Sequence, residues 1–366
     1  MKKIIFKKLL NEILIFFLIF SSALTLIVWV IQAVNYLDIV TEDGHSFDVY
    51  FNYTALSLPK LFSQTLPFVF FLSVFYIINN FETNNQLLIY WTHGISKKEF
   101  INKILVFSLL FLIIQIFLTT LLVPHTNNKS RSFIRSSNLD FFPNLIKPKK
   151  FIDAVTGLTI FIDSKDKNGD YQNIILKDSS ASTTQIIIAQ SGKIILREDK
   201  KFLLLYTGQI IRKNIKNNIT IFNFEETQFD LSKYSSKTTK KPKIQELVTT
   251  KLIKCTLFLF KNPERKLQMK NMICEKSFLD NLIQELFKRV YMPIYIVLIS
   301  LAASLLVLKS KNTHNYSIFK VIIFLIGIFL LVISEILLNF TGINHLYNFL
   351  FLFFPIVLFL IIYHYM

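Results

Sequence analysis

The sequence predicts an α-helical membrane protein in which two blocks of three transmembrane helices flank an inserted all-β domain. Three observations predict this fold class. The 366 residues are 52% hydrophobic with a mean hydropathy of +0.46, which is too apolar for a soluble domain. Six apolar runs are each long enough to cross the hydrocarbon of a bilayer. Between the third and fourth runs, a polar region contains short β-branched and aromatic stretches divided by turn residues.

The first block of helices comprises residues 1–123, with spans predicted at Ile13–Val34, Leu58–Ile78 and Ile104–Val123. Lysines precede the first span, whereas the loop Asn35–Ser57 contains four acidic residues and no Lys or Arg. By the positive-inside rule, the N-terminus is cytoplasmic and this loop lies outside.

The second block comprises residues 290–366, with spans predicted at Val290–Leu308, Ile318–Leu338 and Leu346–Tyr363. Lysines from Lys309 onward mark the connection between the first two of these spans as cytoplasmic. An even number of spans therefore returns the C-terminus to the cytoplasm.

The inserted region, residues 124–289, carries 30 Lys and Arg against 16 Asp and Glu. Evenly spaced strands predict a β-sandwich or an open barrel, with turns at sites such as Ser191-Gly192 and Thr207-Gly208. Two helical segments are expected after the strands, at Ile244–Phe260 and Glu264–Arg289. The predicted strands are Leu158–Asp163, Tyr171–Lys177, Gln185–Gln190, Lys193–Arg197, Phe202–Tyr206, Gln209–Arg212, Ile219–Phe224 and Thr227–Leu231.

The connecting segment between the second and third spans, Asn79–Phe100, contains a short amphipathic helix. Leu87, Leu88 and Trp91 are spaced to share a face of this helix. Gly94 is suited to end it in the left-handed conformation, and Ser96 is suited to cap the helix that follows. The segment is either an interfacial helix lying on lipid or a coupling helix that docks into a cytoplasmic motor subunit. From these residues alone, both interpretations stay open.

The chain contains no motif for nucleotide hydrolysis. It lacks G-x-x-x-x-G-K-[ST], G-x-S-x-G and H-E-x-x-H, so we expect no catalysis, no cofactor and no metal. Active transport would therefore need a separate ATPase. A membrane enzyme is the least favoured class because the outer face shows no cluster of acids and no paired nucleophile and base.

A few polar residues near the ends of spans are candidates for a substrate cavity. Glu335 is the acid inside the fifth span, and Gln32 and Asn35 end the first. Solvation at the interface is the alternative for all three, while Gln115 suits a contact between helices. The basic inserted region either attracts an anionic lipid or an acidic partner, or is a solvated lysine-rich surface, and we expect no nucleic acid. Cys255 and Cys274 are either free thiols or a disulfide.

Six short motifs, in order along the chain, resemble those of the permease subunits of the lipopolysaccharide exporter, the LptF/LptG family (also called the YjgP/YjgQ type). The resemblance covers nearly the whole chain. The motifs are Ile5–Glu12, Leu66-Pro67-Phe68, Trp91–Ser96, Pro148–Asp163, Ile188–Lys193 and the E-x-x-x-R-x-x-x-P pattern of Glu285–Pro293.

This resemblance implies a Gram-negative inner-membrane protein whose inserted domain is a periplasmic jellyroll. It implies a heterodimer with a second permease of the family, a cytoplasmic ABC ATPase dimer, and jellyroll bridge proteins that receive lipopolysaccharide. The start of the inserted domain is nearer to LptF than to LptG. The residues that would contact the ATPase are Glu82, Gln86, Leu87, Tyr90, Trp91, His93 and Gly94.

Two departures from the family pattern concern function. Gln86 stands where the family usually has Glu, and the outer half of the first span lacks the basic residues that some members carry. The alternative function is a mechanotransmission permease that acts on periplasmic partners without moving lipid, and it predicts four spans.

Overall fold

A computed structural model of the chain describes residues 2–41, 46–136, 148–155, 157–166, 170–179, 184–197, 200–213, 219–231, 243–261, 267–269 and 272–365. The chain divides into two compact units. The first comprises Met1–Ile31, Leu56–Lys129 and Lys241–Met366, and the second comprises Gln32–Ala55 and Ser130–Lys240.

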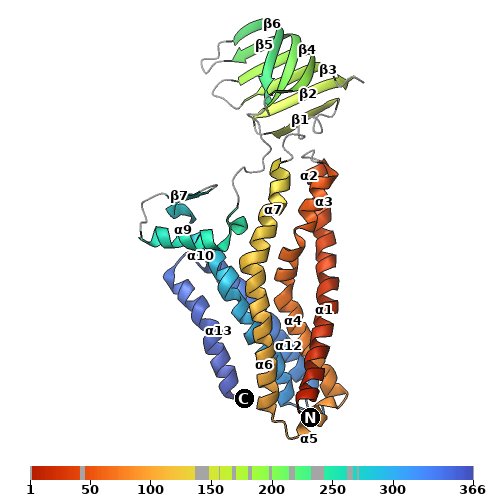
Figure 1. Cartoon of the computed structure of the whole chain (residues 1–366), viewed down its shortest axis with the longest axis vertical. Coiled ribbons are helices and arrows are strands. Elements are labelled where there is room, and N and C mark those ends of the chain that lie inside the picture. Colours follow the sequence, from red (N-terminus) through yellow and green to blue (C-terminus); the bar gives the residue numbers. More distant parts are fainter. Residues whose placement is uncertain are drawn as a thin grey trace. The chain divides into compact units, whose positions relative to one another are not determined.

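Six helical stretches in the described part of the chain are long and apolar enough to cross a membrane, as the sequence predicts. The mechanotransmission alternative, which needs four, does not fit this number. The helices that make up these six stretches are α1 (Lys2–Asn35), α2 (Asp38–Thr41), α3 (Phe47–Ala55), α4 (Leu58–Thr83), α6 (Lys97–Phe117), α7 (Val123–Ser136), α10 (Leu279–Leu286), α11 (Tyr295–Ser304), α12 (Tyr316–Phe340) and α13 (His345–Tyr365). Two further helices, α5 (Gln86–Thr92) and α9 (Thr249–Lys261), lie outside them. Figure 1 labels most of them.

Helix α11 forms the centre of the first unit, where it contacts α4, α6, α12 and α13. Every residue from Leu298 to Ser304 is buried. Small residues allow these close approaches. In α12, a Cβ added at Gly327 would overlap the ring of Phe71 in α4. The buried hydroxyls of Ser300 and Ser304 donate to carbonyls three residues earlier, so they add no unpaired group to the apolar interior.

The third and fourth candidate spans each contain a π-helical turn, at Leu118–Leu122 and at Phe287–Tyr291. The two turns are bonded to each other, because the Thr119 hydroxyl donates to the Arg289 carbonyl across 2.6 Å. A π-turn leaves main-chain groups displaced from the regular helical ladder. The hydroxyl of Thr119 here reaches one of these displaced carbonyls.

The inserted domain is one antiparallel sheet of six strands in the order β1-β2-β3-β4-β5-β6, coloured from yellow to green in Figure 1. It confirms the predicted all-β domain between the third and fourth spans. Three of its strands are longer than expected, since β4, β5 and β6 each join two predicted strands. The bounds are β1 Lys150–Val155, β2 Leu158–Lys165, β3 Tyr171–Asp178, β4 Thr184–Arg197, β5 Lys200–Lys213 and β6 Ile219–Asp230.

The predicted turns at Ser191-Gly192 and Thr207-Gly208 are wrong, because both glycines lie inside strands. A Cβ at Gly208 would overlap the carbonyl of Ile188 on the neighbouring strand, so glycine permits a close approach of backbones here. Asn173 and Thr207 have φ angles of 52° and 49°. These conformations interrupt the ladders without ending the strands.

The interruptions form a continuous line across the sheet. The register of each ladder from β2 to β6 skips one pair, and the skipped residues are Asp163, Asn173, Gln190, Thr207 and Glu225, one on each strand. Four of these side chains are polar amides or acids. The sheet therefore has one polar line along which its hydrogen bonding is broken.

The segment after the sheet differs from the predicted pair of helices. Helix α9 agrees with the first, but the second begins only at α10, after two short strands, β7 (Leu267–Met269) and β8 (Met272–Cys274). Cys255 of α9 and Cys274 of β8 form a disulfide. This covalent link holds Cys274 beside α9. The predicted helix Glu264–Arg289 would have run through Cys274, which instead lies in β8.

Candidate functional site

The connecting segment has the local structure that its sequence predicts at the C-terminal end of its helix. Gly94 adopts a φ of +68°, which ends α5. The Ser96 side chain then accepts a hydrogen bond of 3.1 Å from the main-chain nitrogen of Glu99 and caps α6. At the other end, Asn85 precedes α5 with a φ of 57°. The short helix is thus bounded on both sides by left-handed residues.

One side of α5 is buried against the first turns of α1 and α6. Leu87 is 1% exposed and Tyr90 is 2% exposed. The Tyr90 ring lies edge-on to Phe6, with centroids 5.7 Å apart, and edge-on to Phe100 at 5.1 Å. Its hydroxyl donates to the carbonyl of Ile5 across 3.1 Å. Burial raises the pKa of Tyr90 and the charge of Glu12 adds to this, so the ring stays neutral.

The other side of α5 is open. Leu88 is 59% exposed and Ile89 is 48% exposed, so the expectation that Leu87 and Leu88 share a face is wrong. Trp91 is half-buried and its ring lies 5.8 Å from that of Phe100. His93 is exposed, and its Nδ1 lies 2.7 Å from the carbonyl oxygen of Ile89. The residues that could meet a partner are therefore Leu88, Ile89 and His93 rather than Leu87 and Tyr90.

Glu82, at the end of α4, binds the loop between the fourth and fifth candidate spans. Its Oε1 accepts a hydrogen bond of 2.7 Å from the main-chain nitrogen of Lys311. The Lys311 ammonium donates to the carbonyl of Thr83 at 2.9 Å, and the Lys97 ammonium donates to the carbonyl of Leu308 at 2.8 Å. These three bonds join the region around the connecting segment to the loop between the fourth and fifth candidate spans, which lies on the same side of the helices.

Gln86 begins α5 with a half-buried side chain. Its Oε1 is buried, and within the described part of the chain it has no hydrogen-bond partner. A carboxylate at this position would therefore be a buried charge without a donor in the subunit. The sequence has the neutral amide here, which lowers that cost.

The three candidate residues for a substrate cavity are partly or fully exposed. Gln32 is half-buried and Asn35 is exposed at the end of α1, while Glu335 is exposed on α12. Gln32 and Asn35 belong to the second unit and Glu335 to the first, so a cavity lined by all three stays a prediction. The buried Gln115 donates to the carbonyl of Ser63 in α4 at 2.8 Å, which agrees with its expected role between helices.

Arg289 is the residue whose importance the sequence analysis missed. Its side chain is 3% exposed and pairs with Glu285 at 2.9 Å. The guanidinium also donates to the carbonyls of Leu247 at 2.7 Å and Gln245 at 3.0 Å, and to the Thr249 hydroxyl at 3.0 Å. One cation thereby fixes the chain that enters α9 against the start of the fourth span. The sequence signal was a Glu and an Arg four residues apart just before an apolar run.

Comparison with known proteins places the chain in a family. The sequence model described as "Lipopolysaccharide export system permease LptF/LptG" matches residues 7–366. One similar curated protein is the uncharacterised protein RP871 of Rickettsia prowazekii (strain Madrid E), which is 26% identical over 239 residues. That alignment covers 64% of this chain and spans 65% of the length of its relative. Because the family model extends over nearly the whole chain, the protein belongs to the LptF/LptG family of lipopolysaccharide export permeases.

Proposed function

We propose that this chain is the permease subunit of an ABC transporter that extracts lipopolysaccharide from the inner membrane and passes it to a periplasmic bridge. A separate cytoplasmic ATPase dimer supplies the energy, and a second permease of the family completes the transmembrane part. Family membership and six apolar helices make the chain an integral protein of the inner membrane. The chain itself is non-catalytic in this proposal, in keeping with its lack of a phosphate-binding loop.

The observation that carries the proposal is the contrast between the two sides of α5. Leu87 and Tyr90 are buried against α1 and α6, whereas Leu88 and Ile89 expose a small apolar surface. A helix held firmly on one side and open on the other suits the transfer of motion from a bound protein. Glu82 and Lys97 extend the connection to the loop before α12, so a displacement of α5 would move α1, α4, α6 and the end of α11 together.

The exposed edge of the sheet supports the proposed bridge. Strand β6 is an edge strand whose Ile219, Ile221 and Phe222 are each more than half exposed. An exposed apolar edge strand is a ready template for adding a strand from another chain. In our proposal the jellyroll of the bridge pairs here and continues the sheet.

The distribution of charge supports the proposed orientation in the membrane. Lysines cluster at the N-terminus of α1, at the start of α6 and in the loop after Leu308, which are all on the side of α5. Under the positive-inside rule this side is cytoplasmic, both termini are inside, and the sheet is periplasmic. The same orientation gives α5 access to a cytoplasmic ATPase.

Copurification of the ATPase with the tagged chain tests the proposal. Replacing Leu88 and Ile89 together by Asp puts two charges on the proposed docking surface, and we expect at least a tenfold loss of bound ATPase. The matched control is Ile4→Asp, since Ile4 is 74% exposed in the first turn of α1 and lies outside that surface. The control is expected to retain the ATPase. Full retention by the double variant, at normal membrane levels, would rule the docking surface out.

A further inference from the structure

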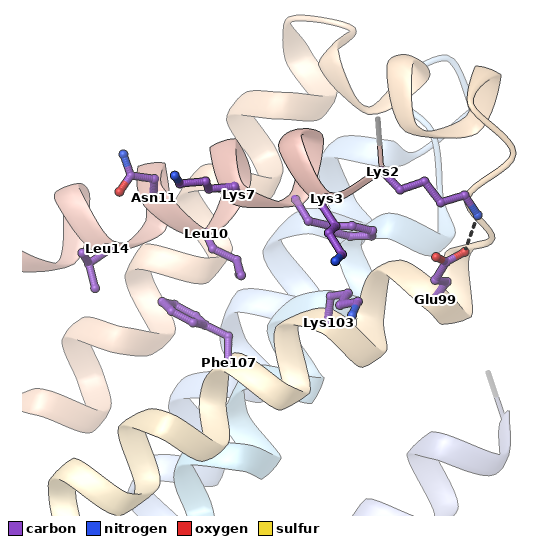
Figure 2. A pocket seen from close by; sticks show the side chains of 10 residues that line it. Lys2, Lys3, Lys7, Leu10, Asn11, Leu14, Glu99, Lys103 and Phe107 are labelled. Atoms are coloured by element: carbon purple, nitrogen blue, oxygen red, sulfur yellow. Dashed lines mark hydrogen bonds and ion pairs between the residues drawn. The ribbon is translucent and has the colours of Figure 1, made fainter.

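A pocket opens between α1 and α6 next to the connecting segment, and the proposed transport function does not use it. Its volume is about 500 Å³. The first four turns of α1 form one wall and the first three turns of α6 form the other (Figure 2). The lining residues are Lys2, Lys3, Phe6, Lys7, Leu10, Asn11, Leu14, Glu99, Lys103 and Phe107. We refer to it as the lysine pocket.

The polar end of the lysine pocket has an excess of positive charge. Glu99 is the one acid among the lining residues, and its carboxylate pairs with the Lys2 ammonium at 3.2 Å. This pair leaves Lys3, Lys7 and Lys103 without a balancing acid in the pocket. Glu12, the nearest acid along α1, pairs instead with Lys8. Lys3, Lys7 and Lys103 are exposed, so their attraction for a phosphate comes from three like charges around one open pocket and not from burial.

The other end of the pocket is mostly apolar. Leu10, Leu14 and Phe107 line it together with Asn11, and in Figure 2 Leu10 points toward Phe107. These residues lie along helices that are long and apolar enough to cross a membrane. The pocket therefore runs from a charged end at the helix termini to an apolar end along the helices, which is the polarity of a phospholipid headgroup followed by its acyl chain.

We propose that the lysine pocket binds an anionic glycerophospholipid of the leaflet on the side of α5. The lysines would hold its phosphate, and Leu10, Leu14 and Phe107 would contact the first carbons of an acyl chain. Basic pockets between transmembrane helices on the cytoplasmic side are a known form of acidic-lipid site. A volume of about 500 Å³ has room for one phosphodiester headgroup, and none of the candidate cavity residues Gln32, Asn35 and Glu335 lines this pocket.

Lys2 connects the pocket to the connecting segment. Besides Glu99, its ammonium contacts the carbonyl oxygen of Gly94, the residue that ends α5, at 3.4 Å. A lipid phosphate in the pocket would draw α1 and α6 together beneath this contact. Bound anionic lipid should therefore stabilise the junction of α1, α5 and α6. The proposed membrane orientation enters this inference at one point only: it decides which leaflet supplies the bound lipid.

The experiment uses the purified full chain, delipidated in a neutral detergent. Dioleoylphosphatidylglycerol, dioleoylphosphatidylcholine or inorganic phosphate is added, and the melting temperature and lipid adducts by native mass spectrometry are recorded. We expect phosphatidylglycerol to raise the melting temperature by several degrees and to form a one-to-one adduct. Phosphatidylcholine and inorganic phosphate should do neither, because one lacks net charge and the other lacks an acyl chain.

The test variant is Lys7→Gln with Lys103→Gln, and the matched control is Lys8→Gln with Lys98→Gln. Each pair removes one lysine from α1 and one from α6, but Lys8 and Lys98 do not line the pocket. The test variant should weaken phosphatidylglycerol binding at least tenfold, the control should not, and Lys7→Arg with Lys103→Arg should bind as the wild type does. Equal losses in test and control, or an equal shift with phosphate, would overturn the assignment. The assay contains no ATPase and does not depend on how the chain is oriented in a membrane. A negative result would therefore reject the lipid site and leave the proposed transport function untouched.

Discussion

The hydroxyl of Tyr90 donates a hydrogen bond to the main-chain carbonyl of Ile5, 85 residues earlier in the chain, across 3.1 Å. This bond joins the short helix α5 to the first turns of α1. Together with the aromatic contacts of Tyr90 to Phe6 and Phe100, it makes the two helix starts and α5 one packed unit. Any force on α5 is then shared by the first and third candidate spans.

Replacing Tyr90 by Phe should weaken this junction without disrupting the aromatic packing. The change removes one hydrogen bond, which contributes about 0.5–1.5 kcal/mol to stability. We expect a slightly lower melting temperature of the purified chain and a loss of transport that exceeds any loss of ATPase binding. Tyr90→Ala also removes the ring and should cost roughly 3–5 kcal/mol, by analogy with other buried aromatic residues. Equal melting temperatures for the wild type and Tyr90→Phe would show that the bond contributes nothing.

Alkaline pH should destabilise the chain partly through Tyr90. Burial raises the pKa of Tyr90 above its ordinary value of 10.0 in the folded chain. Folding thus favours the neutral phenol. The stability that this preference contributes is fully present below about pH 10, the pKa of Tyr in the unfolded chain. Above that pH the unfolded chain releases the proton first, so stability falls by at most about 1.4 kcal/mol per pH unit for this one group until the folded-state pKa is reached.

The measurement for this prediction is the melting temperature from pH 8 to pH 11 for the wild type and Tyr90→Phe. The variant has no proton to lose at position 90, so its stability should fall less steeply above pH 10. The two curves should be parallel below that pH. Parallel curves over the whole range would remove Tyr90 from the alkaline response.

Arg289 should be essential for folding of the segment between the sheet and the fourth span. Arg289→Met leaves the Glu285 carboxylate and the carbonyls of Leu247 and Gln245 without their donor, which should cost roughly 3–5 kcal/mol. Arg289→Lys should recover only part of this because one ammonium cannot reach acceptors on several sides. Thermal stability in detergent and the amount of protein in the membrane report both effects. A stable Arg289→Met variant would show that these acceptors find other donors.

Gln86 should tolerate an apolar residue better than a charged one. In the isolated chain, Gln86→Glu would place a carboxylate where Oε1 has no donor within the described residues, at a cost of roughly 1–3 kcal/mol or more. Gln86→Met keeps the length and removes the unpaired oxygen, so it serves as the control and should be neutral. The comparison is made by thermal unfolding of the purified subunit without its partners. A Gln86→Glu variant as stable as the control would mean that solvent reaches this oxygen.

The helices of this protein are predictable from sequence because bilayer thickness sets their length and the absence of charge marks them. The predicted span Leu58–Ile78 lies inside α4, and Ile318–Leu338 lies inside α12. Local chemistry also identifies caps: Gly94 and Ser96 perform the predicted roles. These features depend on residues close together in the chain.

Features set by distant contacts were not predictable. Gly192 and Gly208 are typical turn residues, yet both lie within strands, at positions where neighbouring backbones and side chains leave no room for a Cβ. The spacing of Leu87 and Leu88 could not decide which of them is buried. Leu87 lies in the buried cluster that contains Tyr90, whose hydroxyl donates to the carbonyl of Ile5. Likewise, the carbonyls of Leu247 and Gln245 that accept from Arg289 lie 42 and 44 residues away in the chain, so a sequence pattern alone gave Arg289 no role.

The central claim is that the exposed side of α5 contacts a cytoplasmic ATPase. The most direct measurement is cross-linking in intact cells from a photoreactive amino acid placed at position 88, followed by identification of the attached protein. We predict that this side chain attaches to an ABC ATPase, whereas the same probe at position 4 does not. Attachment to a periplasmic protein from position 88, or to lipid alone in cells that contain the assembled exporter, would contradict the account.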